Sequence, residues 1–248
     1  MGEVVRIAGV SRDRRWWRVE NLEDGYQGWV RTWGMVPVTA RDAARWRRKA
    51  RARVVVSYTE VRSGTVPDAL VSPLFWNSLL IAGRARAGRR RVVLPDGRSG
   101  WVPSQSLGGS RPPGLIARVR SLLGVPYLWG GRTPSGFDCS GFTQQVLAEQ
   151  GIRLPRDADQ QFHVSRSLPD GEEAKLGDLI FFGPPRARLT HVGLCLGGGF
   201  FAHASGEVRI SSIDLVNTLR DKELERQFRG VRRPGKGLSR RPESTESA

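Results

Sequence analysis

Cysteine and histidine are scarce in this chain, and their scarcity limits the chemistry it can perform. Among 248 residues there are two cysteines, Cys139 and Cys195, and three histidines. Two cysteines cannot build a disulfide framework if Cys139 is needed as a free thiol. The histidines are scattered and lack the paired spacing of zinc ligands, so we expect no metal site.

Long apolar runs are also missing. The N-terminus has no apolar run long enough for a signal peptide, and no stretch reaches the length of a transmembrane helix. As written, the chain is expected to be cytoplasmic and to have no membrane span. If the true start lies upstream of Met1, a signal peptide can precede it, and the protein is then secreted or associated with the cell wall.

Acidic residues are too few to balance the basic ones. The 40 Lys and Arg residues against 24 Asp and Glu give a formal net charge of +16. Such a charge favours binding to a polyanion such as nucleic acid, an anionic membrane surface or an anionic cell-wall polymer. The alternative is that the arginines, clustered at 12–15, 45–53 and 84–91, simply cover solvated faces. The chain has no nucleic-acid-binding motif, so no nucleic acid partner is expected.

The N-terminal part alternates short apolar segments with turn residues. Residues 4–10 and 16–21 are predicted strands, and Asp24-Gly25 is a predicted turn into a third strand. Residues 40–52 are predicted to be a basic helix or linker. Residues 54–107 are again rich in predicted strands, and their end, from Asp96-Gly97 to Trp101-Val102, repeats the earlier Asp24-Gly25 to Trp29-Val30.

These two strand-rich segments resemble bacterial SH3-like domains, modules that are often fused to cell-wall enzymes. The resemblance implies small all-β barrels. The first segment holds only the later half of such a domain, so it is expected to be truncated. Either the start of the chain is assigned too late, or another part of the protein covers the open sheet edge.

The C-terminal half mixes helical and strand patterns. Residues 115–123 are a predicted amphipathic helix, and a second helix is predicted from Cys139 until Gly151. Three later segments should pair as one antiparallel sheet, with a fourth as a further candidate: 176–182, 190–196, 199–206 and 208–213.

Cys139 lies in the first turn of the second predicted helix. The free backbone N–H groups and the positive end of the helix dipole favour a thiolate there, so its pKa is expected to fall. That is how a cysteine nucleophile is prepared. The alternative is that Cys139 is a small buried apolar residue.

Two histidines follow on adjacent predicted strands. His191 opens an apolar strand, and His203 lies in the next one, beyond the glycine turn at 197–199. If these strands pair, both rings can lie on one side. His191 would then take the thiol proton, and His203 would orient its ring. The alternative for each is a core histidine with satisfied hydrogen bonds.

Several motifs together resemble the NlpC family of papain-like peptidoglycan peptidases. The match covers about residues 115–231. The resemblance implies Cys139 as nucleophile, His191 as base and His203 as third polar residue. It also places Tyr127 beside the cysteine, where it can bind substrate or the oxyanion. The motifs are Y-L-W-G-G-x-T-P-x-G-F-D-C-S-G from Tyr127, L-P-R-D from Leu154, G-D-L-I-F-F from Gly177, H-V-G from His191 and F-x-H-A from Phe201.

The same resemblance implies a pocket for a free amine. In members with N-terminal SH3-like domains, residues matching Asp138, Ser140 and Tyr127 hold the amine of an N-terminal L-alanine. The first SH3-like domain caps the cleft, and Tyr26 is the candidate wall residue from it. Arg156 and Asp157 match the L-P-R-D motif and either shape the pocket or form a structural ion pair.

The sequence thus predicts an α+β papain-like cysteine peptidase without a cofactor. Its substrate is a peptidoglycan stem peptide, L-Ala-γ-D-Glu-diamino acid, cleaved before diaminopimelate or lysine during cell-wall recycling. Alternatives are a secreted hydrolase of intact peptidoglycan, a non-catalytic wall-binding protein and an acyltransferase of the same lineage. Cys195 is expected to be an inert core thiol and His163 a surface residue. The expected organisation is a partial SH3-like domain at 1–37, a linker or helix at 38–52, an SH3-like domain at 53–108, the peptidase domain at 109–234 and a disordered tail at 235–248.

Overall fold

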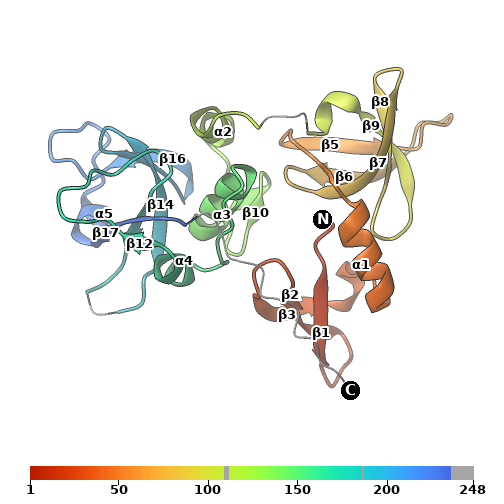
Figure 1. The fold of residues 1–248 in the computed structure, drawn as a ribbon, viewed down its shortest axis with the longest axis horizontal. Coiled ribbons are helices and arrows are strands. Elements are labelled where there is room, and N and C mark those ends of the chain that lie inside the picture. The colour runs from red at the N-terminus through yellow and green to blue at the C-terminus, as the bar shows by residue number, and fades with distance from the viewer. Residues whose placement is uncertain (109–111, 186, 236–248) are drawn as a thin grey trace.

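The computed structural model describes residues 1–108, 112–185 and 187–235. The predicted tail, apart from residue 235, and residues 109–111 at the start of the predicted peptidase domain lie outside this range. Figure 1 shows a C-terminal α+β part on the left, a β-rich part at the upper right and a small sheet below them. Helix α1 lies between the small sheet and the β-rich part.

The first sheet consists of three antiparallel strands in the order β1-β2-β3, which confirms the three predicted strands. The turn before the third strand contains Gly25 at a φ of 73°, a left-handed conformation that glycine adopts without strain. The side chain of Asp24 accepts a hydrogen bond from the backbone N–H of Tyr26 at 3.0 Å, which closes the turn. The strands are β1 (Val5–Val10), β2 (Trp16–Asn21) and β3 (Gln27–Arg31), followed by a 3-10 turn, Thr32–Gly34.

Helix α1 (Ala40–Lys49) confirms the predicted basic helix and begins where Thr39 caps it. The Thr39 hydroxyl accepts a hydrogen bond from the backbone N–H of Asp42 at 3.1 Å. The indole N–H of Trp46, on this helix, donates to the carbonyl of Gly2 at 2.9 Å. This bond fixes the N-terminal segment against the helix.

The second sheet has six strands in the order β4-β7-β8-β9-β5-β6. It includes β6, whose strand pattern is interrupted by Pro73. Strand β6 lies at the sheet edge, where a proline removes no central ladder bond. The strands are β4 (Ala52–Arg53), β5 (Tyr58–Arg62), β6 (Leu70–Phe75), β7 (Leu79–Arg86), β8 (Arg89–Val93) and β9 (Ser99–Pro103), and a 3-10 turn follows at Ser104–Ser106.

The C-terminal domain packs helices against a third sheet, whose order is β12-β17-β13-β14-β15-β16. The three segments predicted to pair, and the further candidate, are adjacent strands of this sheet. Its central elements are α2 (Leu115–Leu122), α3 (Cys139–Glu149), β13 (Leu179–Phe182), β14 (His191–Gly197), β15 (Phe200–Ser205) and β16 (Glu207–Ser212). Around them lie the short pair β10 (Arg132–Thr133) and β11 (Gly136–Phe137), α4 (Ala158–Val164), β12 (Arg166–Ser167), α5 (Lys222–Arg226) and β17 (Phe228–Arg233).

Helix α3 is buried along most of its length, because it lies between the third sheet and the second sheet. Phe142 and Val146 share a core with Val192 and Leu194 of β14. Trp76, which follows β6 of the second sheet, is 2% exposed and belongs to this same core. The second sheet therefore contributes a side chain to the core of the C-terminal domain.

Candidate active site

The start of helix α3 is held by a closely packed glycine-rich loop. Asp138 caps the helix, and its Oδ1 accepts a hydrogen bond from the backbone N–H of Gly141 at 2.7 Å. Any Cβ on Gly141 would collide with the carbonyl oxygen of Gly131. Glycine is needed here because the loop crosses directly over the first helical turn.

Cys139 is the first residue of α3 and lies against the beginning of β14. Its Sγ is 4.0 Å from the carbonyl oxygen of Thr190, the residue before His191. The helix therefore presents the thiol to the backbone of the strand that carries the predicted base. The side chain is nonetheless well shielded, since Cys139 is only 7% exposed.

The predicted fall in the pKa of Cys139 is wrong. Burial raises the pKa of the thiol above its ordinary value, although the backbone N–H groups of Val192 and Ser140 favour the thiolate. The helix N-terminus acts in the predicted direction but is outweighed by desolvation. In the free protein Cys139 is therefore a neutral thiol, which needs a base to become a nucleophile.

The two predicted catalytic histidines are brought together by the pairing of β14 and β15. Nε2 of His191 lies 2.8 Å from Nδ1 of His203, and the rings are nearly perpendicular, at 86°. Burial lowers the pKa of His191 to about 4 and that of His203 to about 3. Both rings are therefore neutral at pH 7, and the Nδ1 atom of His191 is the ring nitrogen left for the thiol.

No hydrogen bond joins the thiol of Cys139 to the ring of His191 within the described residues. Such bonds are often long in free enzymes and shorten when substrate binds. The structure thus places Cys139 against the start of β14 and orients His191 through His203. The transfer of a proton between Cys139 and His191 stays a prediction.

Asp138 and Arg156 form a buried ion pair beside the cysteine. Nη1 of Arg156 donates to Oδ1 of Asp138 and to Oγ of Ser140, at 3.0 Å each. Asp138 also accepts from the backbone N–H of Gly130 at 2.9 Å. Its charge and its hydrogen-bonding capacity are already used, which weakens the interpretation of Asp138 as the sole partner of a substrate ammonium group.

Asp157 was expected to act together with Arg156, but the structure separates them. Arg156 pairs with Asp138, whereas Asp157 caps helix α4 with its side chain and lies 3.5 Å from the exposed guanidinium of Arg188. Arg156 and Asp157 thus form separate ion pairs, and a role of either residue in shaping the pocket stays a prediction. Asp157 fixes the start of α4, and Arg156 fixes the start of α3.

Tyr127 lies opposite Phe137 in the loop that precedes α3, and its place beside the cysteine stays a prediction. Burial raises the pKa of the Tyr127 phenol, and the charge of Asp138, together with that of Cys139 when it is a thiolate, raises it further. Tyr26 approaches the same region from the first sheet. Burial lowers the pKa of Arg156, but Asp138 more than offsets this, and Tyr26 makes a smaller contribution that raises it.

The first sheet contacts α3 directly. Nε2 of Gln144, on α3, donates to Oδ2 of Asp24 at 3.0 Å and to the carbonyl of Leu154 at 2.9 Å. Asp24 belongs to the turn between β2 and β3, which Figure 1 shows just below α3 and β10. This contact holds the Tyr26 turn beside the candidate active site.

The remaining cysteine and histidine lie away from this chemistry. Cys195 is buried in β14, and burial raises its pKa to about 12. The ring of His163 is exposed and lies 3.8 Å from Asp159. Within residues 1–108, 112–185 and 187–235, the side chains of His, Cys, Asp and Glu form no cluster that could hold a metal. No helix in the same part of the chain is long and apolar enough to cross a membrane.

The sequence analysis missed two polar residues that support the site. Gln161 is fully buried, and its Nε2 donates to the carbonyls of Ser140 and Pro155 at 3.0 Å each. Oγ of Ser211, on β16, lies 3.0 Å from Nε2 of His203. Neither residue lies in a recognised motif, and their partners are distant in sequence, so no local pattern could reveal them.

Comparison with known proteins identifies the C-terminal domain. Residues 124–233 match the model of the NlpC/P60 family. The chain is 40% identical over 113 residues to a gamma-D-glutamyl-L-lysine dipeptidyl-peptidase of Bacillus subtilis, a match over 44% of this chain and 38% of the relative. It is 42% identical over 105 residues to the peptidoglycan endopeptidase RipB of Mycobacterium tuberculosis, over 37% of this chain and 42% of the relative. The chain thus spans about two fifths of the length of these curated relatives.

A solved structure extends the similarity to the N-terminal sheets. The crystal structure of an NlpC/P60 family protein from Bacillus cereus matches 93% of this chain and 79% of its own, with a TM-score of 0.76 and 23% sequence identity. This likeness shows the fold alone, and the assignment of the first two sheets as SH3-like domains stays a prediction. Residues 124–233 are therefore similar to the NlpC/P60 family, and the chain shares its fold with an NlpC/P60 family protein.

Proposed function

We propose that the protein is a cysteine peptidase that hydrolyses the bond between γ-D-glutamate and a diamino acid in peptidoglycan stem peptides. One observation carries the proposal. Cys139 begins a helix directly against the start of β14, where His191 is oriented by His203 through a 2.8 Å contact. A nucleophile, a base and an orienting group are the three parts that nucleophilic amide hydrolysis requires.

In the proposed reaction, Nδ1 of His191 takes the thiol proton as Cys139 attacks the amide carbon. The resulting oxyanion is stabilised by the backbone N–H of Cys139 and by the phenol of Tyr127. His191 then gives its proton to the leaving amine of the diamino acid, and the C–N bond breaks to leave a thioester. Water, deprotonated by His191, hydrolyses the thioester and restores the thiol.

The preferred substrate in this proposal is a short free peptide with L-alanine at its N-terminus. Two features support it: the turn that carries Tyr26 contacts α3 through the hydrogen bond from Gln144 to Asp24, and the B. subtilis relative is named a dipeptidyl-peptidase. Ser140, Tyr127 and the Asp138–Arg156 pair would line the site for the amine. The competing version, hydrolysis of intact peptidoglycan, is favoured by the relative named an endopeptidase and by the neutralisation of Asp138 by Arg156.

The test is release of diaminopimelate from L-Ala-γ-D-Glu-diaminopimelate. Cleavage is expected with the parent protein and with Cys195→Ala, a matched change of the other buried cysteine, but not with Cys139→Ala. Loss of cleavage on acetylating the alanine amine would support the free-peptide version. Equal cleavage of the acetylated peptide, or of intact peptidoglycan, would support the endopeptidase. No cleavage of any of these substrates would contradict the peptidase proposal.

A pH profile tests the state of the base. His191 accepts a proton in the reaction, so it must start deprotonated. Because burial lowers the pKa of His191 to about 4, kcat/KM should remain high as the pH falls from 7 to about 5 and decline near pH 4. A decline centred near pH 6.5 would show that His191 is not shielded from water in the active form.

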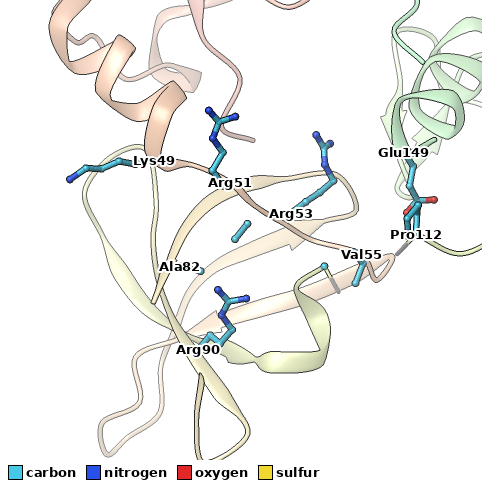
Figure 2. A pocket seen from close by; sticks show the side chains of 10 residues that line it. Lys49, Arg51, Arg53, Val55, Ala82, Arg90, Pro112 and Glu149 are labelled. Atoms are coloured by element: carbon cyan, nitrogen blue, oxygen red, sulfur yellow. The ribbon is translucent and has the colours of Figure 1, made fainter. Parts of the chain in front are cut away.

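The net charge supports a second partner, an anionic cell-wall polymer. A cavity of about 410 Å³ lies between α1, the second sheet and the end of α3. Figure 2 shows its basic side chains. Arg51, directly before β4, and Arg53, in β4, point to the same side. The single carboxylate among its described lining residues is Glu149, which Arg118 already neutralises. Its basic side chains are Lys49, Arg51, Arg53 and Arg90.

Cosedimentation with cell walls tests this partner. The parent protein should bind walls that carry phosphate-rich polymer, and binding should weaken steeply with salt. Lys49→Ala combined with Arg51→Ala should reduce binding more than Arg84→Ala combined with Arg86→Ala, which are exposed arginines outside the cavity. Equal losses for the two pairs would indicate a diffuse charge effect without a defined site.

A further inference from the structure

A buried hydroxyl extends the line of catalytic histidines. Nε2 of His191 contacts Nδ1 of His203 at 2.8 Å, and Nε2 of His203 contacts Oγ of Ser211 at 3.0 Å. His203 is fully buried, and Ser211 is 5% exposed. The pairing of β15 with β16 fixes their relative position. His203 lies opposite Arg209, and Ser211 is two residues beyond Arg209 on β16. The three side chains form one continuous hydrogen-bonded chain.

The base function of His191 dictates the direction of this chain. A neutral imidazole has one N–H donor and one acceptor nitrogen. Nδ1 of His191 must be unprotonated to take the thiol proton, so its Nε2 carries the hydrogen and donates to Nδ1 of His203. His203 must then carry its own hydrogen on Nε2, and that hydrogen needs an acceptor. Oγ of Ser211 is placed to be this acceptor.

Arg209 opposes this arrangement from the same strand. Its Nε, which is always a donor, makes a long hydrogen bond of 3.5 Å to Nε2 of His203. In the tautomer that this bond requires, Nε2 of His203 is an acceptor and the His203 hydrogen lies on Nδ1. His191 would then be protonated on Nδ1 and unable to act as base. Asp221 holds the guanidinium of Arg209 at 3.0 Å and limits its approach.

We propose that Ser211 is a positioning residue that keeps the hydrogen of His203 on Nε2 and thereby leaves Nδ1 of His191 free to accept the thiol proton. The inference rests on the proposed function for its catalytic meaning, but the tautomer itself is a property of the resting protein. The charged groups that face the two histidines are Arg209 on β16 and Asp221 before α5. Burial keeps both rings neutral at pH 7, so the choice of tautomer decides whether His191 is a base.

Nitrogen-15 NMR of histidine-labelled full-length protein tests the tautomer directly. The chain has three histidines, and the exposed ring of His163 provides an internal reference. The parent at pH 7 should show His203 protonated on Nε2. Ser211→Ala should move a substantial fraction of the hydrogen to Nδ1, and Ser211→Thr should restore Nε2. A parent protonated on Nδ1, or an unchanged pattern in Ser211→Ala, would overturn the proposal.

Kinetics supply the second readout. Ser211→Ala should lower kcat on the order of 100-fold with little change in KM, because the wrong tautomer of a catalytic histidine removes the base and leaves binding intact. Ser211→Thr should recover most of this loss. The matched control is Ser212→Ala, which removes the neighbouring buried hydroxyl that bonds the carbonyl of Gly199 at 2.9 Å. It should leave both tautomer and kcat unchanged.

A double substitution separates positioning from structural damage. Adding Arg209→Met to Ser211→Ala removes the opposing donor, so kcat should rise above that of Ser211→Ala alone. A fall in kcat that is not accompanied by a change of tautomer would overturn the role assigned to Ser211. Failure of the parent to cleave any peptide would count against the proposed function alone, because the NMR result does not depend on turnover.

Discussion

The two N-terminal sheets carry the same repeated motif but contact the C-terminal domain in opposite ways. In the second sheet, Trp101 of the motif packs against Gly64, where any Cβ would collide with the indole ring. In the first sheet, the equivalent Trp29 is 54% exposed. Both motifs begin with an Asp-Gly turn closed by the same side-chain bond, from Asp24 to Tyr26 N–H and from Asp96 to Arg98 N–H at 3.0 Å each. Local sequence therefore fixes the turn but does not decide what the sheet packs on.

The second sheet is attached by buried contacts. The indole N–H of Trp76 donates to Oε1 of Glu149 on α3 at 3.0 Å, and its ring lies at 74° to that of Phe137. Arg118 on α2 pairs with the same carboxylate at 2.7 Å and donates to the carbonyl of Val55 at 3.0 Å. The side chains of Trp76, Arg118 and Glu149 are all buried at this junction, so we expect the second sheet to unfold together with the C-terminal domain.

The first sheet is attached by polar contacts: the partly buried hydrogen bond from Gln144 to Asp24 and two surface ion pairs. Arg132 lies 3.1 Å from Glu3, and Arg153 lies 3.4 Å from Glu23. Such surface pairs contribute roughly 0–1 kcal/mol each. The difference between the sheets suggests a division of roles: the second stabilises the fold, and the first adjusts the candidate active site through the turn that carries Tyr26.

The largest expected effect is on the buried junction. Trp76→Ala should lower the free energy of unfolding by about 4 kcal/mol, because it leaves a large cavity in a closely packed core. The matched control is Trp33→Ala, since Trp33 is 84% exposed and its loss should change stability by less than about 0.5 kcal/mol. Urea denaturation of both variants checks this. Equal losses would show that the junction is no more important than the surface.

The second prediction concerns the charge in the junction. Glu149→Gln should lower the free energy of unfolding by about 3 kcal/mol, because it leaves the guanidinium of Arg118 buried without a counter-ion. The double variant Arg118→Met with Glu149→Leu should recover much of this loss. Urea denaturation is again the measurement, with Glu60→Gln, in an exposed pair with Arg62, as control. A loss below about 1 kcal/mol for Glu149→Gln would mean that water reaches the pair.

Sequence patterns predicted the elements better than the contacts between them. The Asp-Gly turns, the basic helix and the helix that begins at Cys139 are local signals, and the structure confirms all three. The docking of Trp76 against Glu149 joins residues 73 positions apart, and no local pattern specifies such a partner. Strand β6 shows a related limit, since its edge position, which permits Pro73, is visible only in the folded sheet.

The candidate site shows the same difference between local patterns, which were predicted, and contacts between distant residues, which were not. Cys139, His191 and His203 were found because their motifs are local, and strand pairing brings the two histidines together as expected. The pairing of Asp138 with Arg156 and the support of His203 by Ser211 were not found. The pKa of Cys139 was wrongly predicted because its burial depends on how α3 packs against β14, whereas the helix dipole is visible in the sequence.

The third prediction tests whether the first sheet shapes the substrate site. Tyr26→Ala should raise KM about fivefold with kcat nearly unchanged, on the scale of one aromatic contact of about 1 kcal/mol. The control is Trp29→Ala, which removes a larger aromatic side chain from β3, the strand that directly follows Tyr26. It should leave KM unchanged. Peptide cleavage kinetics measure both. If the two variants behave alike, the first sheet does not reach the substrate.

The smallest expected effect is on the exposed contacts of the first sheet. Glu3→Gln combined with Glu23→Gln removes both surface pairs and should lower the free energy of unfolding by less than about 1 kcal/mol in total. The effect should disappear at 1 M salt, where screening acts over roughly 3 Å, whereas the effect of Glu149→Gln should persist because its pair is buried. Urea denaturation at low and high salt distinguishes the two. A salt-resistant loss of several kcal/mol in the surface variant would place the first sheet in the same folding unit as the second and remove the basis for assigning it an adjustable role.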